Sequence, residues 1–479
     1  MLRLLDILDN KAMNEDDPTF TYIYRLLEIV SPYVEQDQLP LNTIEILLRA
    51  AIVNGIGSED AISLGDIAIS YINVDRFQRH IIASDEWILA LQYLISSYSP
   101  DIEFLDFSIP APEEILVLPT VNDESELISS RKAMVEALSD LSVLPDFQQK
   151  YAYNSNVEEV TALAKSSTAL TSRTSSSQGR IVLESLKQLL SAKQVPQVQL
   201  CSCILLGNLA RSDTMGQYML SHLNIQQDLL EIVRSSSDDQ VLHSTLAFLR
   251  NLAIPSQNKE VLQDSGILES LSRFWGASAT IKPQMTYSAA MVARQVINGC
   301  IANVRRLLRP LSTDHSSPAH SKTYLSLILA SFTLIDDIAV KTEVGRIVAA
   351  VLRAVVSTQD AALADLLFTL HGDLATPLGV MVTQNQYPVI RSEGWFAMAL
   401  MARSAAGAEL LHVLLSDAAV FGALGATISG STSTIQTKDS TPELSSEPSP
   451  DQQAKDRQNA LVLVNEMLKH GVRLQIPFV

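Results

Sequence analysis

The sequence is poor in cysteine, in aromatic residues and in the residues that break helices. Its 479 residues include 3 cysteines, 6% aromatic residues, 18 glycines and 19 prolines. Three cysteines cannot form a disulfide framework, which indicates a reducing compartment. Leu, Ala, Ile, Ser and Val dominate instead, a composition that favours helices over a β-sandwich or barrel. Cys201 and Cys203 are expected in the apolar core, because no other Cys or His cluster lies nearby to complete a metal site.

Long apolar runs are also absent. A membrane-spanning helix needs about 18 to 20 apolar residues, and the strongest candidate, TYLSLILASFTLIDDIAV at 323–340, is interrupted by Asp336 and Asp337. We predict that this segment is one buried helix. Charged residues likewise interrupt the N-terminal MLRLLDILDN, which predicts an amphipathic helix and no export signal. We therefore expect a cytoplasmic protein without stable membrane insertion.

Positive charge is scarce in the first 150 residues. They hold 26 Asp and Glu against 9 Lys and Arg, a balance of −17, whereas the rest of the chain holds 27 against 26. Phosphates would be repelled by this region, so nucleic acid is not an expected partner. The acidity favours a basic partner, with a solvated acidic face as the alternative.

Sequence motifs of bond-making chemistry are missing as well. The chain has no Gly-x-Ser-x-Gly, no P-loop and no His-Glu-x-x-His. We therefore predict that the protein is not an enzyme in the chemical sense and uses no cofactor and no metal.

What the sequence does contain is a repeated pattern, Leu-x-Asn-Leu-Ala. LLGNLARSD and AFLRNLAIPS place Asn208 and Asn251 43 residues apart in similar surroundings. The same order of apolar, small and polar residues recurs at Asp66 in LGDIAIS, at Asp140 in LSDLSVL and, more loosely, at Gln295 in VARQVIN. A second segment with apolar residues at the helical period follows the first four of these. Intervals of 43 and 44 residues match the period of about 40 to 47 residues in armadillo and HEAT repeats.

These repeats predict an all-α fold, a right-handed armadillo/HEAT-type α-solenoid of about 8 to 10 repeats without a sheet. Gly266 is expected at a helix end in the left-handed conformation. The predicted organisation is acidic N-terminal repeats at 1–164 with a loop at 105–127, a Ser/Thr-rich loop at 165–179, central repeats at 180–310, a linker at 311–321, C-terminal repeats at 322–427, a disordered loop at 428–453 and a closing helix at 454–473.

In an armadillo stack the third helix of each repeat lines a concave groove. A polar residue that recurs there among apolar neighbours does not serve the core, so Asn208 and Asn251 are expected to form a ligand-facing ladder. Asp66 and Asp140 would make its acidic N-terminal part, and Gln295 would continue it. The alternative is that each Asn hydrogen-bonds backbone within its own repeat and satisfies a carbonyl or N–H group between helices. The spacing leaves both alternatives open.

LLGNLARSD followed by STLAFLRNLAIPSQNKEVL resembles the paired repeats of the armadillo-type small-GTPase GDP dissociation stimulator (smg GDS) family. That family has Leu-Gly-Asn-Phe-Ala-Arg-Asn-Asp and then Leu-Arg-Asn-Leu-Ala-Ile-Pro, with Asn-Lys shortly after. The clear similarity covers residues 200–310, and weaker echoes follow in VKTEVGRIVAAVLRA and RSEGWFAMALMARSA. Leu-x-Asn-Leu-Ala is common in armadillo proteins, so the Arg-Asn-Leu-Ala-Ile-Pro continuation is what makes the similarity specific.

The resemblance implies a guanine nucleotide exchange factor and chaperone for small GTPases of the Rho and Rap class with basic, prenylated C-termini. It also implies a groove for the GTPase switch region, an acidic patch for the basic tail and an apolar pocket for the lipid. The GTPase-binding residues expected in the groove are Asn208, Arg211, Ser212, Asn251, Gln295, Glu343 and Arg346. Ser212 and Gly345 depart from the family pattern, which has Asn at both positions.

The alternative function is an armadillo scaffold or adaptor that binds a partner without affecting its nucleotide. Importin-type grooves place a Trp four residues before each ladder Asn. Trp87, Trp275 and Trp395 are not so placed, which disfavours an importin. Release of labelled GDP from Rho and Rap proteins would distinguish an exchange factor from a scaffold.

Overall fold

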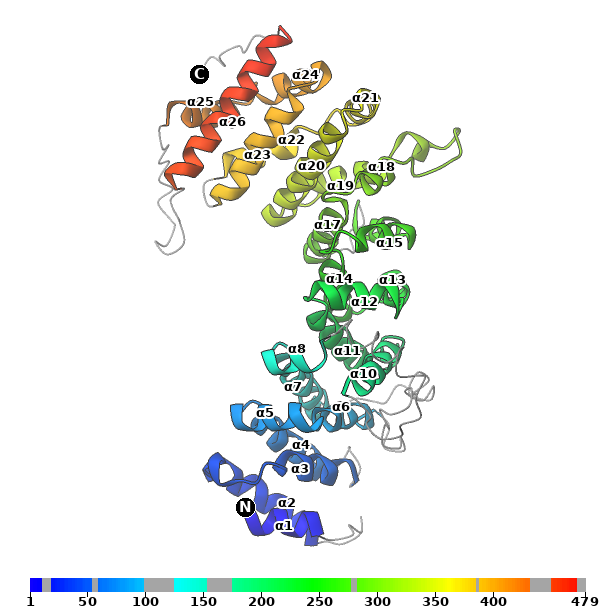
Figure 1. The fold of residues 1–479 in the computed structure, drawn as a ribbon, viewed down its shortest axis with the longest axis vertical. Helices are drawn as coiled ribbons and strands as arrows, with labels where there is room; N and C mark the ends of the chain where they lie inside the picture. The colour runs from blue at the N-terminus through cyan, green and yellow to red at the C-terminus, as the bar shows by residue number, and fades with distance from the viewer. Residues whose placement is uncertain are drawn as a thin grey trace, which may run out of the picture. The chain divides into compact units, whose positions relative to one another are not determined.

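The computed structural model describes residues 1–10, 19–53, 59–98, 125–152, 175–276, 282–384, 387–430 and 449–471. It divides the chain into two compact units, Met1–Leu252 (unit 1) and Ala253–Val479 (unit 2). The boundary falls inside the central segment predicted at 180–310. The regular elements of the described residues are all helices, and the one bridge of extended backbone among them joins Pro310 to Thr323. The predicted all-α repeat architecture is therefore confirmed (Figure 1).

Unit 1 is built from short helices separated by tight turns. They are α1 (Leu2–Asn10), α2 (Thr19–Val30), η1 (Ser31–Tyr33), η2 (Gln36–Gln38), α3 (Thr43–Val53), α4 (Glu59–Ile72), α5 (Asp75–Ser84), α6 (Trp87–Ser96), α7 (Ser125–Ser142), α8 (Pro145–Lys150), α10 (Ser175–Leu189), α11 (Pro196–Leu209), α12 (Asp213–Ser221), α13 (Ile225–Ser235) and α14 (Asp239–Leu252). Helices α4, α7, α11 and α14 pack one against the next.

Unit 2 has the same character. Its helices are α15 (Asn258–Asp264), α16 (Ile267–Leu271), η4 (Ser272–Phe274), α17 (Pro283–Ile297), α18 (Ile301–Leu307), η5 (Pro318–Ser321), α19 (Tyr324–Leu334), α20 (Ile338–Thr358), α21 (Ala361–Leu370), α22 (Thr376–Thr383), α23 (Pro388–Met401), α24 (Ala405–Leu414), α25 (Ala418–Ser429) and α26 (Pro450–Lys469). Helices α17, α20, α23 and α26 again pack in order, and Figure 1 shows the last three side by side.

We call these two consecutive sets, α4, α7, α11 and α14 in unit 1 and α17, α20, α23 and α26 in unit 2, the ladder helices. Eight such helices among the described residues correspond to eight repeats, within the predicted range. A repeat that cannot bury its apolar face alone becomes stable by stacking on its neighbours, which is the physical basis of a solenoid. The apolar positions of α11 and α20 are accordingly buried along almost their whole length.

Local sequence signals account for several helix ends. Gly266 has φ 80° and separates α15 from α16, as predicted, because glycine adopts the left-handed conformation without a steric penalty. Asn224, with φ 51°, likewise precedes α13. Ser449 accepts a hydrogen bond from the Gln452 N–H, and Pro450 opens α26, the usual capping arrangement for a helix N-terminus.

The prediction of one buried helix at 323–340 is wrong. Helix α19 ends at Leu334 and α20 begins at Ile338, and both of these side chains are exposed at the break. The cause is Asp337, whose carboxylate accepts a hydrogen bond at 2.9 Å from the Val340 N–H and so caps a new helix. The interrupting aspartate is thus a helix start.

Several predicted loops are shorter than expected where the structure describes them. Residues 125–127 already belong to α7 and residues 175–179 to α10, while 105–124 and 165–174 lie outside the described residues. At the other end, α25 continues to Ser429, and α26 runs over Pro450–Lys469 where 454–473 was predicted. Residues 431–448 also lie outside the described part. Ser and Pro, which suggested loops, are common in the first turn of a helix.

Cys201 and Cys203 are buried in α11, as predicted. Among the described helices, none is by itself both long and apolar enough to cross a membrane. The bent pair α24 and α25 meets that criterion only when the two helices are taken together.

Candidate functional site

The predicted site residues lie on the ladder helices, with two exceptions. In unit 1, Asp66 is on α4, Asp140 on α7, Asn208 on α11 and Asn251 on α14. Because these helices pack consecutively, the structure brings the four positions into one series. In unit 2, Gln295 is on α17, and Glu343 and Arg346 are both on α20.

Arg211 and Ser212 are the exceptions. Helix α11 ends at Leu209, and both residues lie exposed in the turn before α12. The Ser212 hydroxyl shares a hydrogen bond of 2.9 Å with the Thr214 hydroxyl. These two side chains therefore extend beyond the end of a ladder helix and do not belong to the series itself.

Both asparagines donate a hydrogen bond to the preceding ladder helix. Asn208 Nδ2 donates to the Ser142 hydroxyl on α7 at 2.8 Å, and Asn251 Nδ2 donates to the Gly207 carbonyl on α11 at 2.9 Å. Both asparagines are half-buried. The Asn251 bond to a backbone carbonyl between helices is of the kind that the structural alternative predicts, whereas Asn208 bonds a side-chain hydroxyl.

Gly207, the small residue before Asn208 in LLGNLARSD, has a packing role. A Cβ atom on Gly207 would lie 3.2 Å from Cβ of Phe248 on α14, tighter than an ordinary contact. The absence of a side chain lets α11 and α14 approach closely, and this closeness brings the Asn251 amide within reach of the Gly207 carbonyl. Gly207 in the first copy of the motif therefore permits the approach of the two helices, and Asn251 in the second copy makes the hydrogen bond across it.

The acidic positions of unit 1 are more accessible than the asparagines. Asp66 and Asp140 are both exposed. The Asp66 carboxyl lies beside α7, where partial burial raises its pKa and a hydrogen bond with Ser130 opposes that rise. No ion pair in the described residues neutralises either carboxylate, so this part of the series carries uncompensated negative charge.

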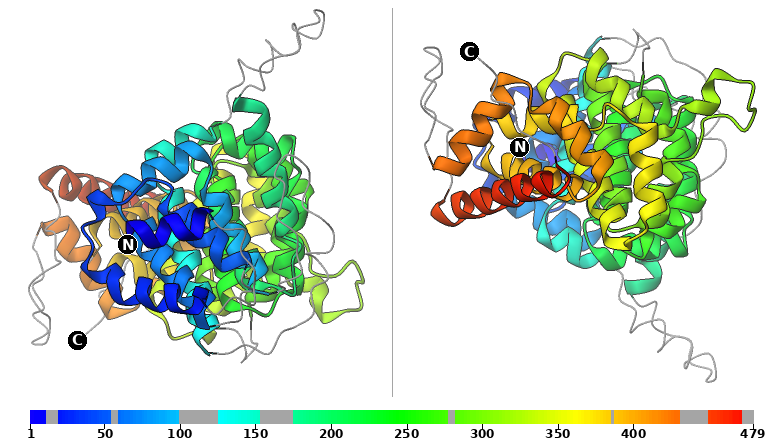
Figure 2. Two further views of the ribbon diagram at one scale, coloured as in Figure 1. Left: turned by 90° about the horizontal axis from the view of Figure 1, so that it is seen from below. Right: turned by 90° about the horizontal axis from the view of Figure 1, so that it is seen from above.

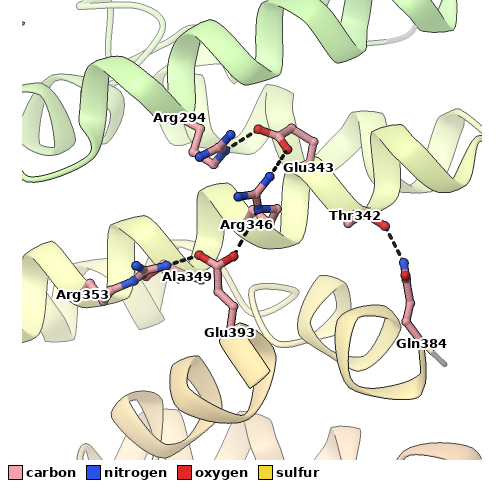
Figure 3. Close-up of polar contacts among 8 residues, drawn as sticks. All are labelled: Arg294, Thr342, Glu343, Arg346, Ala349, Arg353, Gln384 and Glu393. Carbon is pink, nitrogen blue, oxygen red and sulfur yellow. Dashed lines mark hydrogen bonds and ion pairs between the residues drawn. The ribbon is translucent and has the colours of Figure 1, made fainter. Parts of the chain in front are cut away.

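In unit 2 the equivalent helices carry an ion-pair chain. Glu343 Oε1 pairs with Arg294 Nε on α17, and its Oε2 lies 3.3 Å from Arg346 Nη1. Arg346 Nε lies 3.1 Å from Glu393 on α23, and Glu393 also pairs with Arg353. Figure 3 shows the five charged side chains alternating in sign across three helices. We call this set the charge chain.

Burial sets the energetics of the charge chain. Glu343 is only 2% exposed, so its charge depends on the two guanidinium groups that flank it. Burial by itself would lower the pKa of Arg346, but the attraction of Glu343 and Glu393 outweighs it, and that pKa is raised. With three arginines and two glutamates, the charge chain has a net charge of +1.

Gly345 lies inside the packing between helices. A Cβ atom there would come within 2.7 Å of the Met381 sulfur on α22 and within 3.0 Å of the Pro377 carbonyl oxygen. The asparagine of the resembled family would not fit at this position without moving α22. The departure at Gly345 therefore has a packing cause in this chain.

Arg294, Arg353 and Glu393 were missed by the sequence analysis. Arg294 and Glu343 are 49 residues apart, and Arg346 and Glu393 are 47 apart. Both separations are close to the repeat length. Opposite charges one repeat apart are the sequence signal that could have identified these partners.

The described residues contain no candidate metal site, and two of the cysteines are not activated as nucleophiles. They contain no group of three or more His, Cys, Asp or Glu placed to hold a metal ion. Burial raises the pKa of the Cys201 thiol and raises that of Cys203 to about 12, so the thiolate needed for nucleophilic attack is disfavoured at both.

Comparison with known proteins identifies no family. No family model matches the chain, and no curated protein matches it. Matching solved structures include crystal structures of engineered proteins. One has 14% identity and a TM-score of 0.46, covering 97% of this chain and 98% of its own. Two others have TM-scores of 0.42 and identities of 14% and 17%; each covers 60% of this chain and nearly all of its own length.

Proposed function

We propose that this protein binds small GTPases of the Rho and Rap class, with basic, prenylated C-terminal tails, along its ladder helices. It promotes GDP release from them, chaperones them, or does both. The resemblance of LLGNLARSD and LRNLAIP to the smg GDS family supports this proposal, and so does the all-α repeat architecture. The expected location is the cytoplasm, where such GTPases are found.

One observation of the structure carries the proposal. In unit 1, successive ladder helices present exposed Asp66 and Asp140 and then half-buried Asn208 and Asn251. A row of unneutralised carboxylates is suited to attract a polybasic segment, and neighbouring amides can offer hydrogen bonds to the folded part of the same partner.

Exchange requires no bond-making residue in this chain. An exchange factor binds the nucleotide-free GTPase more tightly than the loaded one, and that difference in affinity is the activity. The groove therefore needs side chains that favour one partner conformation. The exposed acids would contribute mainly to the rate of association, because long-range attraction steers the encounter.

A second candidate is a scaffold or adaptor that leaves the nucleotide in place. It is favoured by the asparagine bonds, because one N–H of each amide is already used within unit 1. An amide engaged in this way holds the repeats in register and has less capacity to grip a GTPase switch region. Partner binding without exchange follows from that arrangement.

The test measures release of fluorescently labelled GDP from prenylated and unprenylated Rho and Rap proteins, with and without this chain, and direct binding alongside. Faster release supports exchange, and binding without faster release supports the scaffold.

The double variant Asp66→Asn with Asp140→Asn should associate more slowly with a polybasic GTPase. A matched control, Asp146→Asn with Asp213→Asn, removes two exposed carboxylates from the short helices α8 and α12 and should have no such effect. Absence of any binding would refute the proposal.

A further inference from the structure

Helix α2, at the N-terminal end of unit 1, has two apolar faces. Ile23, Tyr24 and Leu27 are buried, and α2 packs against α4. The opposite side also carries apolar residues, but these are open to solvent. They are Tyr22, Leu26, Ile29 and, in the following η1 turn, Tyr33, which are 68%, 48%, 64% and 87% exposed.

The spacing of these four residues places them on one side. Residues at i, i+4 and i+7 share a helix face, and Tyr33 continues the row at i+11. We call this row the outer stripe. Contiguous apolar surface of this kind on a folded protein marks an interaction site more often than scattered single residues do. Figure 2, seen from below, shows α1 and α2 with no other helix of unit 1 in front of them.

The way the helices of unit 1 stack on one another indicates what kind of element fits the outer stripe. Within unit 1, helix α4 has a packed neighbour on both sides, α2 on one and α7 on the other. Helix α2 has the apolar residues for two such neighbours, and among the described helices it packs mainly against α4. Terminal repeats of a solenoid normally present a polar outer face. The outer stripe is therefore suited to a further helix laid across α2.

The charges around the outer stripe indicate the chemistry of that helix. Three exposed acidic residues lie on or just after α2, namely Glu28, Glu35 and Asp37. The same segment has one exposed basic residue, Arg25. Helix α1 beside them is also acidic on balance, with Asp6 and Asp9 against Arg3. Two copies of this face would bring like charges together, which disfavours a homodimer.

We propose that the outer stripe of α2 binds an amphipathic helix of another protein, with an apolar face against the stripe and basic residues on its polar face. The four exposed side chains provide the apolar contact, and the acidic residues around them orient the helix. This site is separate from the ladder helices and does not depend on the proposed GTPase function.

The experiment uses the full-length chain and a fluorescein-labelled synthetic peptide of about 18 residues, long enough to form a helix. The peptide has Leu on one face and Lys on the other, and binding is followed by fluorescence anisotropy. Two control peptides are a scrambled sequence of the same composition and one with Glu in place of Lys. We expect the Leu/Lys peptide to bind at least about tenfold more tightly than either control.

Matched variants locate the binding. Leu26→Ser with Ile29→Ser should weaken binding at least about tenfold, since it removes apolar contact without changing charge. Val389→Ser with Val413→Ser alters two residues that are each 72% exposed in unit 2 and should leave binding unchanged. Circular dichroism verifies that each variant is folded. Equal binding by both double variants, or by the scrambled peptide, would overturn the proposal. So would sedimentation velocity showing a dimer that the Leu26 and Ile29 substitutions abolish, because the occupant would then be a second copy.

Discussion

Replacing Asn251 by alanine removes a hydrogen-bond donor from the end of another helix. Asn251 Nδ2 lies 2.9 Å from the Gly207 carbonyl oxygen, in the last turn of α11. Carbonyl groups in the last turn of a helix lack an intrahelical donor. The N–H of Arg211, four residues further on, donates to the Asn208 carbonyl. The Gly207 carbonyl therefore depends on the side chain from the next repeat.

The loss of stability in Asn251→Ala can be estimated from the loss of the only hydrogen bond described for the Gly207 carbonyl. A buried acceptor left without a partner destabilises a protein by about 1 to 3 kcal/mol. For a unit of this size, 1 kcal/mol corresponds to about 2 to 4 °C in melting temperature, so we expect Asn251→Ala to lower Tm by about 2 to 12 °C. Asn208→Ala is the matched comparison and should destabilise by less than about 1 kcal/mol. Its partner, the Ser142 hydroxyl, also donates to the Ser139 carbonyl at 2.7 Å and so retains a bond.

Thermal unfolding of the two variants, followed by circular dichroism, measures both effects. A melting temperature for Asn251→Ala equal to that of the wild type, or a larger loss for Asn208→Ala, would refute the reasoning. GTPase binding is measured on the same folded samples. A loss of affinity of about 5- to 150-fold in a normally folded Asn208→Ala would show that this amide also contacts the partner. Unchanged affinity would mean that Asn208 is not one of the GTPase-binding residues.

Other predictions concern the charge chain, the packing glycine and the acidic ladder positions. Glu343→Gln should destabilise unit 2 by about 2 to 4 kcal/mol in urea unfolding, because two guanidinium groups lose a buried partner. Gly345→Asn should destabilise it by about 1 to 3 kcal/mol through the clash with Met381, and equal stability would contradict the packing argument. Association with a polybasic GTPase should slow between about 50 and 200 mM salt, and Asp66→Asn with Asp140→Asn should reduce this dependence. Because the pKa of Asp66 is raised on folding, the native state holds its proton more readily. Its contribution to stability should therefore decline as pH rises above the ordinary pKa of an aspartate, about 4, and Asp66→Asn should abolish that decline.

The sequence sufficed for the ladder helices because their signals are local. Apolar residues at the helical period around a recurring polar position predicted α11 and α14, and the structure has Gly207 at the close approach of these two helices. The break between α19 and α20 was missed although its signal is also local. An Asp just before an apolar run is an N-cap pattern, and Asp337 was read only as an interruption.

The charge chain was harder to predict, because most of its sequence signal is a spacing of about one repeat between opposite charges and not a local pattern. Arg346 lies three residues after Glu343 on α20, so that ion pair has a local signal, but the pairing of the Glu343 carboxylate with Arg294 on another helix has none. Such a pair depends on the relative rotation of two packed helices, which a single sequence does not specify. The role of Gly345 depends likewise on the position of Met381, 36 residues later.

The hydrogen bond from Asn251 to Gly207 also has a consequence for folding during synthesis. During synthesis, α11 leaves the ribosome 44 residues before the side chain that completes its C-terminal end. At about 5 to 20 residues per second, that interval is about 2 to 9 s. For those seconds the end of the helix lacks its partner, and it is completed only when the next repeat has been made. A nascent chain stalled before Asn251 should therefore show a frayed C-terminal turn in α11, which one more repeat of translation would close.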